Sequence, residues 1–265
     1  MPNPTEGYPL AAAISPRVQA VAVTDSTNAD VIRHVTEAPA QWPHLSLLLT
    51  TDQRAGRGRL DRTWVAPPGT ALAVSVLVRV PGIPPHARGW IPLSAGAAMT
   101  RAVREQLRGT GHAAGLKWPN DVLLDGGKLC GILCEVVPAD PDAVVIGVGV
   151  NTRMPRTDLP VETAASFEAS GLEVDEDRLL ADFLAALDEH LTALAVADGD
   201  AVAAGLLAEV QSLCTTIGSD VAVSLPDGEV LAGRALRLDA EGRLIVEQEG
   251  EFESAVSAGD VIHVR

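Results

Sequence analysis

Four arginines are concentrated in one glycine-interrupted segment, Gln53–Trp64, of a chain that is otherwise acidic. The whole chain has 20 Lys and Arg residues and a formal net charge of −15. Guanidinium groups keep their charge at any working pH and bind phosphate through paired hydrogen bonds, and glycine lets the backbone approach a ligand closely. The segment predicts a loop that closes over an anionic small molecule, although an ordinary basic surface loop fits it about equally well when it is read alone.

Further polar clusters interrupt apolar segments. Ser26–Asn28 stands at a predicted helix start, where free backbone N–H groups can hold an anion or carbonyl, or can simply be capped. Lys117–Asp121 lies between two apolar segments, and Lys128 begins a predicted strand, a position where lysine more often serves solubility. Asn151 follows the strand end Gly147–Val150. These glycines are not a dinucleotide fingerprint, because the third glycine is missing and no helix pattern follows.

The clusters share one chemical character, since they offer arginines, lysines, amides and hydroxyls. They contain no plausible activated nucleophile and no acid–base pair. Such donors suit phosphoryl or nucleotidyl transfer, which needs positioning and charge stabilisation more than covalent help. The chain has no P-loop motif. The residues therefore predict an anion-handling α/β site with a mobile loop.

Composition limits the class of protein. A net charge of −15 argues against nucleic acid or an anionic membrane as the main partner. No apolar run reaches the ~18 residues of a membrane span, and no signal segment opens the chain, so we expect a cytoplasmic protein. Cys130, Cys134 and Cys214 cannot form a disulfide framework, and the first two are expected to be buried apolar residues. The six histidines show no metal-ligand spacing.

The elements that must position these clusters follow from hydrophobic periodicity and turn residues. Residues 1–16 are expected to be a loose arm. Strands are predicted at 18–23, 45–50, 70–80, 122–124, 129–137 and 143–150, and helices at 25–36, 91–107, 175–194 and 201–214. Five short strands, at 221–225, 230–238, 244–247, 252–256 and 261–264, predict a small barrel. The expected domains are residues 1–216 and 217–265.

The motifs, taken together, resemble those of the biotin–protein ligases. The match consists of Ser-Thr-Asn at 26–28, Gln53 followed by Gly-Arg-Gly-Arg at 56–59, Lys-Trp-Pro-Asn-Asp at 117–121, Lys-x-x-Gly-Ile-Leu-x-Glu at 128–135 and Gly-x-Gly-x-Asn at 147–151. Each motif is weak alone, but five in family order are specific. The resemblance implies an α+β fold, in which a class II tRNA-synthetase-like core (a mixed sheet flanked by helices) precedes an SH3-like β-barrel.

The resemblance also implies the reaction and its partners. The expected enzyme forms biotinyl-5′-AMP from biotin and ATP, with Mg²⁺ accompanying the pyrophosphate. It then transfers biotin to a lysine of the biotin carboxyl carrier domain of a carboxylase. The N-terminal DNA-binding domain of the bifunctional ligase-repressors is expected to be absent, so DNA is not an expected partner.

Positions for the site residues follow from the same resemblance. Biotin is expected to contact Ser26, Thr27, Asn28, Gln53, Arg57, Gly58, Arg59, Lys128 and Gly131. The nucleotide is expected to contact Arg59, Trp64, Lys117, Asn120 and Asn151. The expected catalytic residues are Lys128, Arg57 and Lys117, whose charges can stabilise the α-phosphate oxygens, and no metal ligands are assigned. Trp64 could instead anchor the loop, which is the commoner use of a lone tryptophan.

Two departures from the family pattern and two alternative functions accompany this prediction. Cys130 stands where the family usually has alanine, and the loop continues Leu60-Asp61-Arg62 where some relatives are more basic. One alternative is a lipoate or octanoate ligase, a class that lacks both the Gly-Arg-Gly-Arg and Lys-Trp-Pro-Asn-Asp motifs. The other alternative is a non-catalytic module that binds a small ligand.

Overall fold

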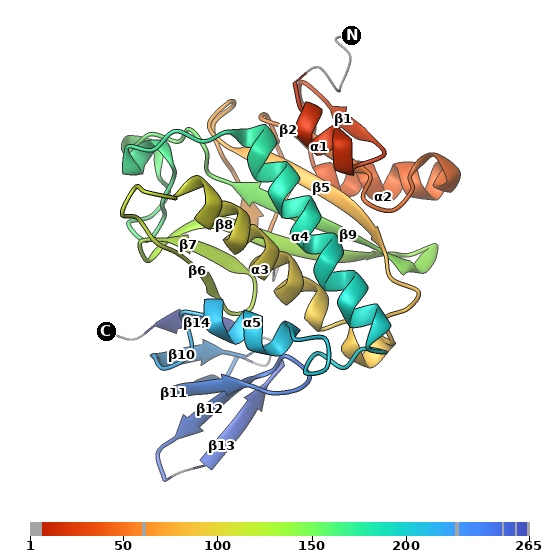
Figure 1. Ribbon diagram of the computed structural model, residues 1–265. Helices are drawn as coiled ribbons and strands as arrows, with labels where there is room; N and C mark the ends of the chain where they lie inside the picture. The colour runs from red at the N-terminus through yellow and green to blue at the C-terminus, as the bar shows by residue number, and fades with distance from the viewer. Residues whose placement is uncertain (1–6, 60–61, 226–227, 251, 258, 264–265) are drawn as a thin grey trace.

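A seven-stranded mixed sheet forms the centre of the larger part of the chain (Figure 1). The computed structural model describes residues 7–59, 62–225, 228–250, 252–257 and 259–263. The strand order is β1-β2-β5-β9-β8-β7-β6, and only the β1–β2 pair is parallel. The strands are β1 (Val18–Ala20), β2 (Leu47–Thr50), β5 (Leu72–Arg79), β6 (Ala114–Lys117), β7 (Asp121–Leu124), β8 (Gly127–Val137) and β9 (Asp140–Val150).

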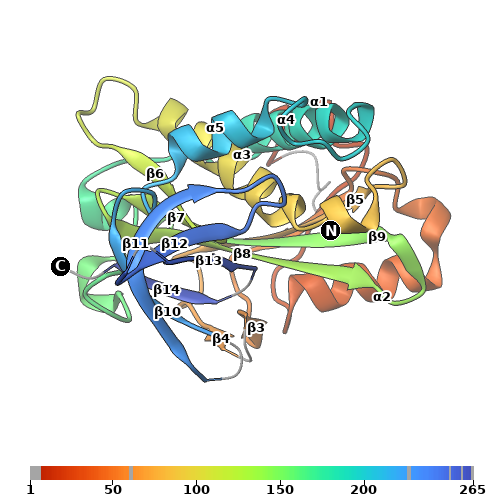
Figure 2. The same cartoon turned by 90° about the horizontal axis from the view of Figure 1, so that it is seen from below.

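Helices cover both faces of this sheet (Figure 2). On one face α3 and α4 pack side by side, and α2 lies on the other. Because successive side chains of a strand point to opposite faces, Leu47 and Leu49 join the core under α3 and α4, whereas Leu48 packs with Val31 and Val35 of α2. The helices are α1 (Pro9–Ile14), α2 (Thr27–Glu37), α3 (Trp90–Gln106), α4 (Glu176–Val196) and α5 (Leu206–Leu213), with short 3-10 turns at Pro39–Gln41, Pro85–Ala87, Arg156–Asp158 and Glu168–Ser170.

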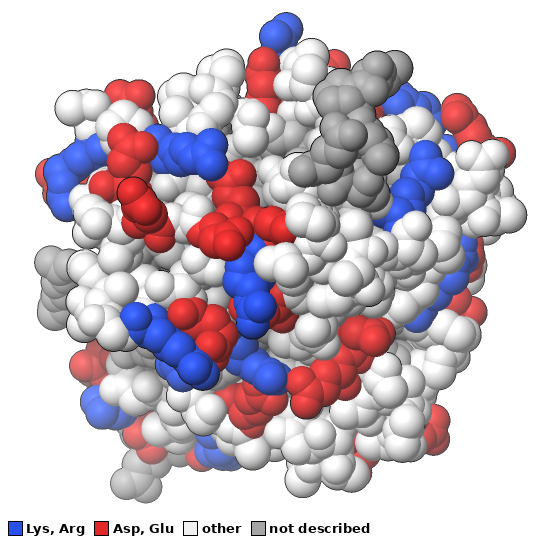
Figure 3. Space-filling model, turned by 45° about the horizontal axis from the view of Figure 1, so that its top comes forward, with Lys and Arg blue, Asp and Glu red and all other residues white. Residues whose placement is uncertain are grey.

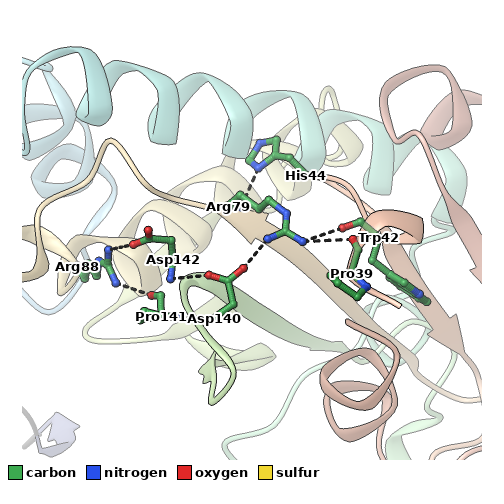
Figure 4. A network of polar contacts seen from close by, with 8 residues as sticks. All are labelled: Pro39, Trp42, His44, Arg79, Arg88, Asp140, Pro141 and Asp142. Carbon is green, nitrogen blue, oxygen red and sulfur yellow. Dashed lines mark hydrogen bonds and ion pairs between the residues drawn. The ribbon is translucent and has the colours of Figure 1, made fainter. Parts of the chain in front are cut away.

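Two arginines contact the N-terminal end of β9 (Figure 4). Arg79 forms an ion pair with Asp140 at 2.6 Å, and Arg88 forms one with Asp142 at 2.5 Å. Arg88 also donates to the carbonyl oxygen of Pro141. Strand β9 begins at Asp140, three residues before the predicted start, where Asp140 pairs with Val137 of β8.

The part of the chain predicted to be a loose arm contains a helix. Residues 9–14 form α1, and the backbone N–H groups of Leu10 and Ala11 each donate to the Asp177 carboxylate at 2.9 Å. Ala11 is fully buried. The prediction is therefore wrong for residues 9–14, because a side chain of α4, distant in the sequence, caps this helix; residues 1–6 lie outside the described part of the chain.

Two other predicted boundaries differ from the structure. Strand β6 (Ala114–Lys117) was not predicted, because only two apolar residues in it precede the polar cluster. The helix expected from residue 201 begins at Leu206, after Gly205 has adopted a φ of +74°. A left-handed residue interrupts a helix, so residues 201–205 form turns.

The C-terminal residues form a separate antiparallel sheet that docks on the larger part. Its order is β13-β12-β11-β10-β14, which agrees with the SH3-like architecture that was predicted. The indole N–H groups of Trp90 and Trp118, both buried, donate to the carbonyl oxygens of Ala240 and Gly242 at 2.9 and 3.1 Å. The division into two domains near Thr216 stays a prediction. The strands are β10 (Asp220–Ser224), β11 (Val230–Leu238), β12 (Leu244–Gln248), β13 (Phe252–Val256) and β14 (Asp260–His263).

The surface charge of the molecule is mixed in sign. On the face that Figure 3 shows, acidic and basic side chains are interspersed and are not gathered into separate areas. None of the helices in the described ranges has both the length and the apolar character needed to cross a membrane.

Candidate active site

A cavity opens beside the end of β9, on the side of the sheet opposite to α3 and α4. Its walls come from the start of α2, from the small hairpin of β3 (Gly56–Arg57) and β4 (Thr63–Trp64), and from β7, β8 and β9. Figure 2 shows the β3–β4 hairpin on the far side of the sheet from α3 and α4. The lining residues include Ser26, Thr27, Asn28, Gln53, Arg57, Gly58, Arg59, Trp64, Asn120, Lys128 and Gly131, all of them predicted site residues, and also Arg62, Asp121, Gly147 and Gly149.

The start of α2 is both capped and part of the cavity wall. The Ser26 hydroxyl caps the helix by accepting a hydrogen bond from the Ala29 N–H at 3.4 Å. The backbone N–H and the hydroxyl of Thr27 both donate to Gln53 Oε1, at 2.8 and 3.0 Å. Capping and ligand binding, which the sequence left as alternatives, can therefore coexist here, with Gln53 fixed against the helix start.

Two glycines of β9 make room for two predicted site residues. A Cβ atom on Gly147 would lie 2.4 Å from Oδ1 of Asn28, and one on Gly149 would lie 2.6 Å from the indole of Trp64. No side chain tolerates such distances, so the glycines allow Asn28 and Trp64 to pack directly on the strand. Trp64 thus anchors the end of the arginine loop and lines the cavity as well.

Lys128 points into the cavity because of an irregularity in its strand. In the β7–β8 pair, Val122 is opposite Cys130 but Leu123 is opposite Lys128, which leaves Leu129 as an extra residue. A bulge of this kind changes the direction of a neighbouring side chain. The Lys128 ammonium forms an ion pair of 2.7 Å with Asp121, whose side chain is 17% exposed.

Gly131 supplies the space beside this ion pair. A Cβ atom on Gly131 would lie 3.3 Å from Cε of Lys128 and 3.4 Å from its Nζ. Asp121 is the last residue of the Lys-Trp-Pro-Asn-Asp motif, but it is not one of the predicted site residues. A carboxylate so close to a lysine-bearing strand start was the signal that could have identified it.

The loop arginines reach different ends of the cavity. Arg57 forms an ion pair of 3.1 Å with Glu135 on β8. Arg59 donates to Oδ1 of Asn120 at 2.9 Å and to the carbonyl oxygen of Gly259 in the C-terminal sheet at 3.3 Å. Leu60 and Asp61, which were expected to affect loop closure, lie outside the described residues.

Lys117 and Asn151 are the predicted site residues that the structure does not place in the cavity wall. The Asn151 side chain donates to the carbonyl oxygen of Ala165 at 2.9 Å, and its backbone N–H donates to that of Leu129 at 3.0 Å. Lys117 ends β6 and lies close enough to His263 for the lysine charge to act on the imidazole. Their roles toward a nucleotide stay predictions.

The proximity of Lys117 and His263 gives a measurable pH effect. Burial, followed by the charge of Lys117, lowers the pKa of His263 below its usual value of 6.5. The Lys117→Gln substitution removes the second cause, so the pKa of His263, measured by NMR titration, should rise. Because the unfolded chain binds the proton first, wild-type stability should fall as the pH drops below about 6.5, and less so in the variant. An unchanged His263 pKa would show that the Lys117 charge does not reach this ring.

The cysteines have no role in this site chemistry. Burial raises the pKa of the Cys130 thiol, and it raises that of Cys134 to about 12. Thiols with such values are unreactive at neutral pH. Cys130 is buried, as expected, whereas Cys134 is only partly buried. Within the described ranges, no group of three or more His, Cys, Asp or Glu residues is placed to hold a metal ion.

Comparisons with known proteins agree with this arrangement. Residues 20–151 match the biotin/lipoate A/B protein ligase family, and residues 216–264 match the biotin protein ligase C-terminal domain. The chain is 36% identical to the biotin–[acetyl-CoA-carboxylase] ligase of Mycobacterium tuberculosis over 94% of its own length and 90% of that protein. It is 30% identical to the bifunctional ligase/repressor BirA of Escherichia coli, over 88% of this chain and 70% of that protein.

Solved structures share the fold. The chain resembles the biotin protein ligase from Aquifex aeolicus in complex with biotin and ATP, with a TM-score of 0.73 and 22% identity, covering 93% of this chain and 97% of that one. It also resembles the biotin protein ligase from Leishmania major in complex with biotinyl-5-AMP, with a TM-score of 0.57 and 24% identity, covering 92% and 99% of the two chains.

Proposed function

The chain belongs to the biotin/lipoate A/B protein ligase family, and on this premise we propose that it is a biotin–protein ligase. It forms biotinyl-5′-AMP from biotin and ATP and transfers the biotinyl group to a lysine of the carrier domain of a biotin-dependent carboxylase. The identity to the Mycobacterium tuberculosis ligase over nearly the whole chain supports this specific member of the family. The observation that carries the proposal is that one cavity receives donors from separate motifs, among them Asn28, Arg57, Asn120 and Lys128.

In the first step, the biotin carboxylate attacks the α-phosphate of ATP in line, and pyrophosphate leaves. Negative charge grows on the equatorial phosphate oxygens, where Lys128 is placed to stabilise it. Arg57 supports the same charge from the loop, while Glu135 holds its guanidinium in place. Lys117 is proposed to act from the nucleotide side, although it lies outside the cavity wall here.

Recognition of the two substrates is divided along the cavity. We assign the biotin end to Ser26, Thr27, Asn28, Gln53, Gly58 and Gly131, together with Arg57, Arg59 and Lys128. We assign the nucleotide end to Arg59, Trp64, Lys117, Asn120 and Asn151. Mg²⁺ would enter with the ATP phosphates, which usually hold this ion with few protein ligands, and among the described lining residues the Asp121 carboxylate could supply one ligand. Bound there, it would neutralise charge on the leaving pyrophosphate.

In the second step, the acceptor lysine attacks the carbonyl carbon of biotinyl-AMP, and AMP leaves. The mixed anhydride is labile to water, so a closed arginine loop would protect it. The attacking amine must lose its proton, because the ordinary pKa of lysine is about 10.4. No DNA partner enters this scheme, and a cytoplasmic location is proposed because ATP is available there and reduced cysteines suit that compartment.

One assay tests the proposal against both alternatives. The protein is incubated with ATP, and pyrophosphate release is measured with biotin, lipoate or octanoate as the acid. We expect release with biotin and far less with the other two acids. Release that favours lipoate or octanoate would identify the other branch of the family, and release with none of them would leave a non-catalytic module.

Replacing Arg59 with glycine is expected to increase the rate at which biotinyl-AMP dissociates from the site. Arg59 joins the loop to Asn120 and to Gly259, and hydrogen bonds from a charged group are worth about 1.5–3 kcal/mol each. Arg59→Gly should therefore release biotinyl-AMP into solution roughly 10-fold faster or more. The readout is biotinylation of an added lysine-rich bystander protein, because Lys117 and Lys128 are the only lysines of this chain. Bystander labelling equal to that of wild type would contradict a closing role for Arg59.

A further inference from the structure

We propose that Glu135 is a positioning residue that presents Asn28 to the cavity as a hydrogen-bond acceptor. On this view, Glu135 makes the site select acids whose tail carries an N–H donor. The inference rests on the proposed function, in which the ligand is biotin, an acid that ends in a cyclic urea. Glu135 is not among the described residues that line the cavity, but it contacts Asn28 and Arg57, which are.

The first step is the direction of the Asn28 amide. Its nitrogen Nδ2 donates to Oε2 of Glu135 at 2.7 Å and to the carbonyl oxygen of Leu133 at 3.3 Å. A carboxylate and a carbonyl can only accept hydrogen bonds, and a side-chain amide has two N–H donors. Both donors of Asn28 are therefore occupied by β8, and this fixes which way the amide faces.

The second step concerns the oxygen that remains. Oδ1 of Asn28 lies 2.5 Å from the Ser75 hydroxyl and directly over Gly147. The Ser75 hydroxyl also lies 2.7 Å from Thr27 Oγ1, and its single proton can serve only one of the two oxygens at a time. An amide oxygen has two lone pairs, so at least one on Asn28 is open. Asn28 and Gly147 both line the cavity. What Asn28 offers to a ligand is consequently an acceptor, and the ligand must bring the proton.

The third step explains why a carboxylate can occupy this position. The Glu135 side chain is 24% exposed, and Arg57 pairs with it at 3.1 Å from the loop. A partly buried carboxylate without such a partner would be costly. The Glu135 carboxylate thereby contacts both Asn28 at the start of α2 and Arg57 in the β3–β4 hairpin.

The chemical consequence is selection between acids of similar shape. The cyclic urea of biotin has two N–H groups, whereas the tails of octanoate and lipoate have none. A site built to hydrogen-bond an N–H group rejects a ligand that lacks it, because a buried polar atom then stays unpaired. The Lys128 ammonium accepts the acid group of any of these ligands and cannot make the distinction.

The Glu135→Ala substitution tests the proposal through the KM values of pyrophosphate release. We expect the KM for biotin to rise roughly 10- to 100-fold, the scale of a lost charge-assisted hydrogen bond, while the KM for ATP changes little. The kcat should fall as well, because Arg57 loses its ion-pair partner. The preference for biotin over octanoate, measured as the ratio of their kcat/KM values, should decrease as a result. Glu135→Gln keeps an acceptor oxygen for Asn28 and should show a smaller rise, and it remains informative if the alanine variant does not fold.

A double-mutant cycle and a matched control complete the test. In an Asn28→Ala background, Glu135→Ala should add little to the rise in the KM for biotin, because Glu135 is proposed to affect biotin binding through Asn28. Glu253→Gln removes a carboxylate that pairs with Arg237 at 2.6 Å in the C-terminal sheet, and it should leave the KM for biotin unchanged.

Three results would overturn the inference: an unchanged KM for biotin in Glu135→Ala, a parallel rise in both KM values, or additive effects in the cycle. Failure of the proposed function looks different, because the wild-type protein would then release no pyrophosphate with biotin.

Discussion

Replacing Lys128 with alanine is expected to lower the rate of biotinyl-AMP formation by roughly 100-fold or more, the usual effect of removing one donor that stabilises transition-state charge. The physical reason is the position of the ammonium group, which a β-bulge turns into the cavity and for which Gly131 leaves space. Because most of the charge develops only as the phosphate is attacked, the loss should appear mainly in kcat and in kcat/KM, with a smaller rise in the KM for biotin, whose acid group is also assigned to Lys128. Single-turnover formation of the adenylate is the direct measurement.

The interpretation of this variant depends on Asp121. Removing Lys128 leaves a carboxylate that is only 17% exposed without its ion-pair partner, and this is expected to cost stability. Thermal unfolding of the variant must therefore accompany the kinetics, and assays should be run well below its melting temperature. Lys128→Arg keeps a positive charge beside Asp121 and should recover part of the rate.

A control for Lys128→Ala is a cation that forms a comparable ion pair away from the cavity. Arg108, at the end of α3, pairs with Glu105 at 2.8 Å and has a side chain that is 78% exposed. Arg108→Ala should leave adenylate formation unchanged, since exposed ion pairs contribute little. If Lys128→Ala stayed within a few-fold of wild type while correctly folded, Lys128 would have only a structural role.

Most of the predicted site residues line one cavity, because each motif places a chemically distinctive side chain near the end of a strand or helix, and their roles toward biotin and ATP stay predictions. Asn28, Gln53 and Lys128 are far apart in the sequence, yet the strand order of the sheet brings them to one cavity. Apolar periodicity and turn residues predicted most of the strands and helices and the small C-terminal group of strands, because they report on short-range order. The mixed sheet flanked by helices was implied by the resemblance to the biotin–protein ligases.

What could not be predicted depends on contacts across the fold. The bulge at Leu129 follows from how β7 pairs with β8, and no local pattern reveals a register shift. Helix α1 depends on Asp177, a residue more than 150 positions later. Asn151 follows a glycine-rich strand end, but its amide is directed at the carbonyl oxygen of Ala165 rather than at the cavity.

The glycines of β9 are a further case in which the sequence does not reveal a contact across the fold, and one of them gives a large expected effect on biotin binding. In the sequence, Gly147 and Gly149 indicate only that space is needed beside a strand. The structure shows which side chains fill that space, namely Asn28 and Trp64. The need for glycine at position 147 therefore bears on ligand binding through Asn28, and adding one methyl group at this position tests it.

Replacing Gly147 with alanine is expected to weaken biotin binding by roughly 100-fold or more, which is about 2.7 kcal/mol. The new Cβ would lie 2.4 Å from Oδ1 of Asn28 and 2.9 Å from its Nδ2, so one of the two residues must move. Gly147 cannot move easily, because its strand pairs with Ser75 on one side and Leu133 on the other. Asn28 must then rotate, and it loses Glu135, Ser75 and the orientation that the ligand requires.

Calorimetric titration with biotin alone measures this effect without catalysis. Gly89→Ala is the matched control, because Gly89 has a φ of −57° and its Cβ would meet its nearest neighbour, the carbonyl oxygen of Glu241, at an ordinary 3.5 Å. That variant should bind biotin as the wild type does. If Gly147→Ala also bound biotin normally, the amide of Asn28 could not be a contact of the ligand, and the biotin end of the cavity would have to be placed elsewhere. The Lys128→Ala and Gly147→Ala variants thus test different parts of one site, since the first should lose mainly rate and the second should lose mainly binding.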